Sequence, residues 1–198
     1  MTAVSAMVFG WTLTQGMPLF ICVLAAMGFG ALMGCLMGIT IAWLRISFLV
    51  VTLGGLSIFQ SLALVMNDGA TLSVFDVPSF AGVSTLVNGR IAGIPYLLLF
   101  DIAMVALAAY VLRYTSFGRA IFAVGSNVDA ARLNGIKVGA VVVAIYSVAG
   151  LANGLGSVIQ VGRLTGAAPQ ADPTLLLVVV TAVLIGGTAY SGGEGGVV

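Results

Sequence analysis

Long uncharged apolar runs alternate with short polar segments along this chain. A helix needs roughly 20 apolar residues to cross a bilayer core of about 30 Å. The runs of that length are residues 18–43, 47–66, 95–112, 139–162 and 174–190, the last of them slightly short. Residues 4–13 are also apolar but shorter, which indicates the tail or half of a helix. The pattern predicts an all-α, polytopic membrane protein with these five full spans and a partial N-terminal helix.

The composition supports a membrane protein and narrows its possible functions. Hydrophobic residues make up 61% of the chain and charged residues 7%, whereas soluble domains carry about 25% charged residues. The net charge of +1 gives no basic surface for nucleic acid. The chain has no histidine, which removes histidine-based catalytic triads and histidine-containing metal sites. We therefore expect neither an enzyme nor a bound cofactor or metal.

One polar segment, residues 113–138, combines several charges with signals for the start and end of a helix. Ser126 followed by Asp129 has the form of a capping box, in which a side-chain oxygen accepts from a free backbone N–H. Gly135 is the residue type that ends a helix in the left-handed conformation. The segment is therefore predicted to hold a short rigid helix between two spans.

The basic residues predict the orientation, because cytoplasmic loops are enriched in Lys and Arg. If residues 113–138 are cytoplasmic, the alternating direction of the spans places each of the remaining basic residues on the inner or the outer side of the membrane. The inside residues are then Arg45, Arg113, Arg119, Arg132 and Lys137, and the outside residues are Arg90 and Arg163. The loop 67–94 and the turn 163–173 are accordingly predicted to face the exterior or periplasm.

Glycines recur at every fourth position in two of the spans. Gly30, Gly34 and Gly38 form one such stripe, and Gly150 and Gly154 form the other. Small residues at this spacing let a neighbouring helix backbone approach closely. We expect them to be packing positions without a chemical role.

A few polar side chains lie inside the apolar runs. Thr52 and Gln60 occur in one span, and Asn153 and Gln160 lie on one face of another because they are seven residues apart. Asp101 lies near the predicted outer end of the 95–112 span. Such groups are costly in lipid unless they face helices or water, so Thr52, Gln60, Asn153 and Gln160 are candidates for a substrate pathway. An interhelical hydrogen bond without any substrate is the simpler explanation for them.

Residues 115–127 (TSFGRAIFAVGSN) and 130–136 (AARLNGI) resemble the cytoplasmic loop of permease subunits of bacterial ABC importers for monosaccharides. These importers include ribose, xylose, arabinose and galactose systems, and autoinducer-2 permeases are similar. Weaker agreement occurs at residues 45–54, 92–95 and 185–195. Family members are longer, so the resemblance implies that residues 1–198 are a single, truncated permease domain.

The resemblance implies that a separate ATPase subunit drives a monosaccharide across the bacterial inner membrane by pushing on this loop. It also implies a second permease subunit and a periplasmic sugar-binding protein as partners. Ala130 and Ala131 would seat closely in the ATPase, and Gly118, Arg119 and Gly125 would shape an entry turn. The full set of implied coupling residues is Gly118, Arg119, Gly125, Ser126, Asn127, Ala130, Ala131, Gly135 and Ile136.

Two other classes of function remain open from the sequence. A secondary transporter or channel would also be polytopic, and its transport would be driven by an ion gradient without an ATPase. A structural membrane subunit would transport nothing. Association with an ATPase subunit through residues 113–138 distinguishes the importer from both.

Overall fold

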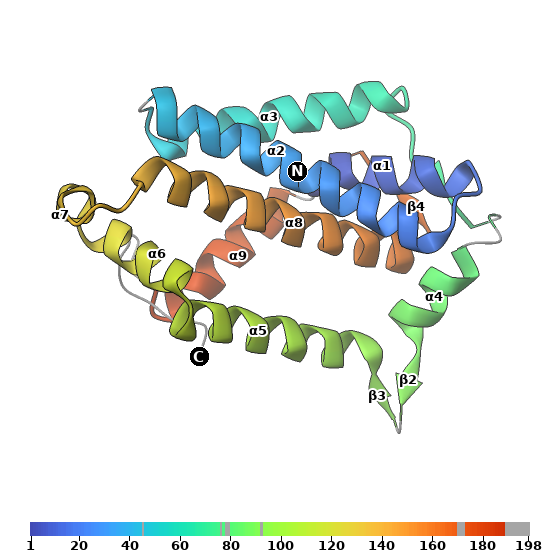
Figure 1. The fold of residues 1–198 in the computed structure, drawn as a ribbon. Coiled ribbons are helices and arrows are strands. Elements are labelled where there is room, and N and C mark those ends of the chain that lie inside the picture. The colour runs from blue at the N-terminus through green and yellow to red at the C-terminus, as the bar shows by residue number, and fades with distance from the viewer. Residues whose placement is uncertain (45, 76, 78–79, 92, 170–172, 189–198) are drawn as a thin grey trace. The chain divides into compact units, whose positions relative to one another are not determined.

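The computed structural model describes residues 1–44, 46–75, 77, 80–91, 93–169 and 173–188. Its helices are α1 (Thr2–Thr14), α2 (Leu19–Leu44), α3 (Phe48–Met66), α4 (Phe80–Asn88), α5 (Tyr96–Tyr114), α6 (Ser116–Ser126), α7 (Val128–Leu133), α8 (Val138–Leu164) and α9 (Pro173–Ile185) (Figure 1). Its strands are β1 (Leu72–Ser73), β2 (Arg90–Ile91), β3 (Ile94–Pro95) and β4 (Gly166–Ala167). The all-α prediction is confirmed, because each strand is only two residues long.

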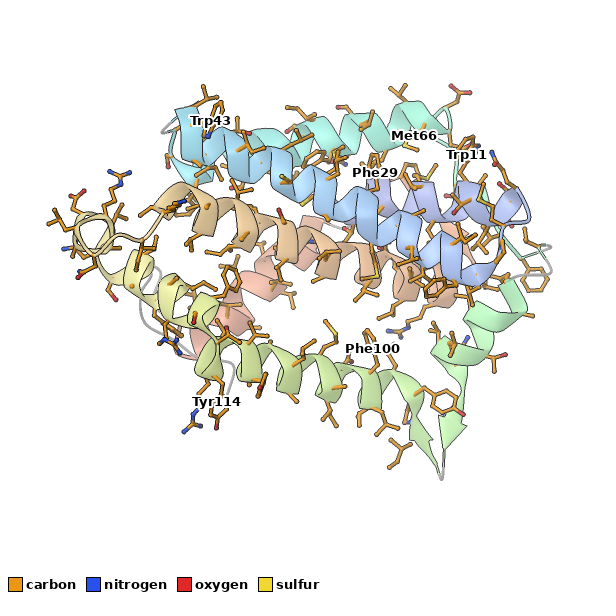
Figure 2. The ribbon with its side chains drawn as sticks, in the orientation of Figure 1. Trp11, Phe29, Trp43, Met66, Phe100 and Tyr114 are labelled. Atoms are coloured by element: carbon orange, nitrogen blue, oxygen red, sulfur yellow. The ribbon has the colours of Figure 1, made fainter. Side chains whose placement is uncertain are left out.

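Four helices are long and apolar enough to cross a membrane, among the residues that the structure describes. They are α2, α3, α5 and α8, with 26, 19, 19 and 27 residues. Large apolar side chains on them remain exposed, for example Phe20 and Trp43, as expected of surfaces that face lipid; Figure 2 shows Trp43 projecting from the end of α2. Arg45, which we predicted to lie on the inner side, is outside the described residues.

The fifth predicted span differs from the prediction, because α9 has only 13 residues. Gly187 has a φ of +83°, which a residue with a side chain rarely adopts. The N–H groups of Gly187 and Thr188 donate to the carbonyls of Leu184 and Val183, so the helix ends in a Schellman motif. The glycine pair at 186–187 therefore ends this helix before residue 190, which lies outside the described residues.

The fold divides into two compact units, of which the first contains Met1–Leu97 and Val143–Ala171. Its core is built around α1, where Val4, Phe9 and Leu13 are completely buried. This short helix is apolar all round and packs against α2 and α3. A short helix is therefore present where one was predicted, over Thr2–Thr14.

One end of the first unit is closed by segments from two loops. β1 and β4 pair antiparallel, with Leu72 opposite Ala167, which joins the 67–94 loop to the turn after α8. Beside them, α4 packs its Val83 and Val87 side chains toward Gly162 of α8. The structure thus brings together the two loops that the basic residues assigned to one side of the membrane.

The second unit contains Leu98–Val142 together with α9. No residue of α5 is buried. In contrast, α6 and α7 pack on each other, with Gly118, Val124 and Ala131 buried. This unit holds the whole charged segment 113–138.

Candidate functional site

The charged segment begins with a helix that we did not predict. Thr115 is the N-cap of α6, and its hydroxyl accepts from the N–H of Gly118 at 3.1 Å. Gly118, Arg119 and Gly125 lie inside α6 and not in the predicted entry turn, although Gly118 lies against Leu112 at the corner between α5 and α6. The missed signal was an amphipathic pattern, with apolar residues at 117, 121 and 124 on one helical face.

Gly118 has a specific role at the corner between α5 and α6. A Cβ atom at this position would lie 2.6 Å from the Cα atom of Leu112, a distance that real side chains do not tolerate. Arg119, one residue on, is exposed, and its guanidinium donates to the Ser116 hydroxyl at 2.9 Å. The corner is therefore tight, with Gly118 of α6 lying against Leu112 of α5.

Asn127, not Ser126, is the N-cap of α7. The Asn127 side-chain oxygen accepts from the N–H groups of Asp129 and Ala130, each at 3.0 Å. The predicted capping box is wrong because Ser126 is still helical and donates its hydroxyl to the Phe122 carbonyl. An N-cap needs an extended backbone, which Asn127 has at φ −158° and ψ 109°.

The other end of α7 is fixed by Gly135, as predicted. Gly135 has a φ of +79°. Its N–H donates to the Arg132 carbonyl, and the N–H of Ile136 donates to the Ala131 carbonyl, both at 3.0 Å. This is a Schellman motif. A six-residue helix is too short to be stable alone, so these caps are what hold α7 in one conformation.

The exposed surface of α7 differs from the one we expected. Ala130 is exposed, but Ala131 is only 3% exposed because it packs within the chain. Leu133 is 90% exposed, although burying a leucine is worth roughly 2 kcal/mol. We did not predict a role for Leu133; the signal was a large apolar residue in the last turn of the capped helix. Between its caps, α7 thus displays two apolar side chains, those of Val128 and Leu133.

The two glycine stripes meet each other. A Cβ at Gly30 or at Gly150 would overlap the carbonyl oxygen of the other, and a Cβ at Gly154 would lie 2.6 Å from the Ala26 oxygen. Further along, Gly34 faces the Tyr146 carbonyl. Residue numbers rise along α2 as they fall along α8, so the helices are antiparallel. These glycines therefore lie where two helix backbones approach each other closely.

This α2–α8 seam extends beyond the predicted stripes. At one end, Gly154 of α8 lies against Ala26 and Met27 of α2. At the other end, a Cβ at Gly38 would lie 2.7 Å from the Val143 Cα. The seam therefore runs from Ala26 to Gly38 of α2.

The polar candidates for a pathway stay on separate helices. Thr52 and Gln60 are half-buried on α3, and Asn153 and Gln160 are half-buried on α8. Thr52 donates to the Leu49 carbonyl, and the Asn153 amide donates to the Ala149 carbonyl, each within its own helix. No hydrogen bond among the described residues joins the two pairs. Their role in a pathway stays a prediction.

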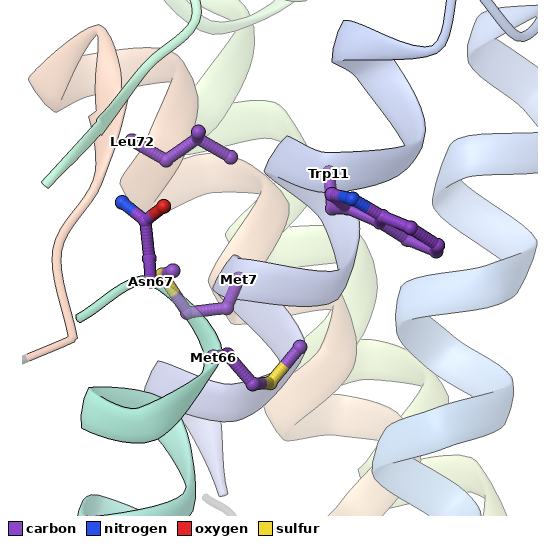
Figure 3. Close-up of a pocket in the computed structure, with 5 residues that line it drawn as sticks. All are labelled: Met7, Trp11, Met66, Asn67 and Leu72. Atoms are coloured by element: carbon purple, nitrogen blue, oxygen red, sulfur yellow. The ribbon is translucent and has the colours of Figure 1, made fainter.

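A hollow of about 300 Å³ lies in the first unit, between α1, the end of α3 and β1 (Figure 3). Its lining residues are Met7, Trp11, Met66, Asn67 and Leu72. The Asn67 amide is already engaged, since it donates to the Ala70 carbonyl at 2.9 Å. A site for a polar ligand needs several convergent polar groups. This lining offers mainly thioether, indole and aliphatic surface, so we assign no sugar site here.

Known proteins resemble almost the whole chain. The model of the family described as "Branched-chain amino acid transport system / permease component" matches residues 1–196. The ribose import permease of Escherichia coli (strain K12) is 32% identical over 179 residues, which cover 90% of this chain and 56% of that protein. The galactose/methyl galactoside import permease of the same strain is 30% identical over 189 residues, covering 92% of this chain and 55% of the relative.

Other relatives carry related descriptions. The L-arabinose transport system permease of Escherichia coli (strain K12) is 31% identical over 158 residues, which cover 80% of this chain and 47% of that protein. No solved structure matches the chain. The chain spans about half the length of the curated relatives it matches. Because the family model matches nearly the whole chain and these relatives are at least 30% identical to it, the chain belongs to the family of transport-system permease components that includes the sugar ABC import permeases.

Proposed function

We propose that this chain is the transmembrane subunit of an ATP-driven importer that moves a monosaccharide across the bacterial inner membrane. The names of the relatives support a sugar as the substrate. The excess of basic residues supports a cytoplasmic position for residues 113–138. A separate ATPase subunit, a second permease subunit and a periplasmic sugar-binding protein complete the proposed importer.

The observation that carries the proposal is the construction of α7. Asn127 fixes its start, Gly135 fixes its end, and Leu133 projects from it into the surroundings. A stiff element can transmit the closure of an ATPase to the spans, whereas a flexible connector would absorb it. In this proposal Leu133 and Ala130 contact the ATPase, and Ala131 holds α7 against its own chain.

The proposal is tested by Leu133→Glu, with Leu86→Glu as the matched control. Leu86 is a 61% exposed leucine of α4, in the loop predicted to lie on the opposite side of the membrane. A central anchor residue contributes about 2 kcal/mol or more, so Leu133→Glu should weaken co-purification with the ATPase subunit roughly thirtyfold and stop sugar uptake. Leu86→Glu should co-purify normally.

Two results would contradict the proposal. One is normal ATPase binding and uptake by Leu133→Glu. The other is sugar uptake that an ion gradient sustains without the ATPase subunit, which would favour a secondary transporter. The orientation is tested separately by Leu133→Cys in a Cys22→Ala, Cys35→Ala background. A membrane-impermeant maleimide should label this variant in inside-out vesicles and spare it in intact cells.

A further inference from the structure

Two arginines lie at the end of α5 and the start of α6. They take no part in the proposed contact between α7 and the ATPase subunit. Arg113 is exposed in the last turn of α5, and its guanidinium carbon lies 5.8 Å from the centre of the Tyr114 ring. Arg119 is exposed on α6 and hydrogen-bonded to Ser116. Among the described residues, neither arginine has a carboxylate within ion-pair distance, whereas Arg132 lies 3.8 Å from Asp129.

The surroundings of these arginines are those of a membrane surface. Tyr110 and Tyr114 form a ring pair at 5.4 Å and are 60% and 64% exposed at the end of a membrane-length helix. Exposed tyrosines at the end of a span are typical of the headgroup level of the bilayer. Figure 2 shows Tyr114 projecting outward at the junction of α5 with α6.

The helix that follows also directs its arginine away from its apolar side. In α6 the apolar side is formed by Phe117, Ile121 and the buried Val124, and Arg119 lies on the opposite side, where it is exposed. Residues 113–138 contain four basic side chains and one acidic one, a balance that attracts anionic phosphates.

We propose that Arg113 and Arg119, flanked by Tyr114, form a binding site for the phosphate of an anionic phospholipid headgroup. Arginine matches phosphate geometry with paired N–H donors. Tyr114 faces one guanidinium and Ser116 positions the other, so both are oriented before the lipid binds. The bound lipid fixes the α5–α6 corner at the membrane surface, from which α7 extends. This site needs no ATPase, and it can be tested on the permease alone.

The test uses tryptophan fluorescence in reconstituted bilayers. Tyr114→Trp, in a Trp11→Phe, Trp43→Phe background, places a single reporter beside the two arginines and keeps an interfacial aromatic there. Quenching by phosphatidylglycerol with brominated chains is compared with quenching by brominated phosphatidylcholine, which gives the relative binding constant of the two lipids. We expect a preference of about fivefold for phosphatidylglycerol at low salt, falling as salt is added.

The arginine variants decide the assignment. Arg119→Gln should bring the preference close to one, and Arg113→Gln should lower it to a similar degree. Arg90→Gln is the control, because it removes the same charge from the predicted opposite side and should leave the preference unchanged. Equal quenching by both lipids in the Tyr114→Trp reporter that keeps both arginines would overturn the proposal, as would a preference that survives Arg119→Gln. Neither result bears on ATPase binding by α7, so the two proposals fail separately.

Discussion

The α2–α8 seam and the α6–α7 segment use glycine and small residues for opposite purposes. In the seam, glycines remove side chains so that two long backbones touch, and the contact is buried over many residues. In the α6–α7 segment, Gly118 and Gly135 shape single points of the chain, and most of the surface between them stays exposed. The seam is held by extended packing, and the segment is held by individual hydrogen bonds.

The α2–α8 seam and α7 are both rigid, although only the seam is buried. The seam is rigid because α2 and α8 cannot separate without losing many packing contacts at once. α7 has almost no burial beyond Ala131, yet both of its ends are fixed by specific caps. An element that binds a partner must keep its surface free, so capping stabilises it without covering it. Substitutions that remove one kind of support should therefore leave the other region intact.

The largest effect is expected from Gly30→Leu in the seam. The new side chain would overlap the Gly150 carbonyl, and the helices would have to separate. Overpacking of this kind costs roughly 3 kcal/mol or more. Gly28→Leu is the matched control, since a Cβ there has no atom within 4 Å. Thermal unfolding in detergent measures both; equal midpoints for the two variants would mean that the seam is not a close backbone contact.

A smaller effect is expected from Gly135→Ala at the end of α7. Alanine at a φ of +79° costs about 1–2 kcal/mol, because its Cβ crowds the following carbonyl. The Schellman motif should loosen, and the amides of Gly135 and Ile136 should exchange hydrogen faster. Unfolding of the seam should be unaffected. Unchanged exchange in this variant would show that the motif does not depend on the left-handed residue.

The smallest effect is expected from Asn127→Ala, which removes the side-chain cap of α7. Loss of an N-cap costs about 1 kcal/mol, so the amides of Asp129 and Ala130 should exchange roughly fivefold faster. Ser126→Ala is the control, because its hydroxyl bonds only within α6. If Ser126→Ala had the larger effect on these amides, the cap would belong to Ser126 after all.

The sequence predicted the long helices of the fold more accurately than it predicted the structure of residues 113–138. Periods of apolar residues located the spans to within about two residues for the four long helices, because the bilayer itself sets their length. The α6 helix was missed because its charges and glycines suggested a turn, although Phe117, Ile121 and Val124 had helical spacing. The assignment of Ser126 as the cap failed for the same reason, because Ser126 still belongs to α6 and a cap must follow the end of the preceding helix.

By itself the sequence determined the membrane character, the four long spans, the glycine stripes and the glycine that ends α7. Each of these features depends on the composition or spacing of residues that are close together in the sequence, so it can be recognised without knowing which distant residues pack against them. Only the tertiary structure decided that the stripes of α2 and α8 face each other antiparallel, that Ala131 is covered, and that Leu133 is displayed. Those outcomes depend on contacts between residues that are far apart in the sequence. Such contacts are determined by how the whole unit packs.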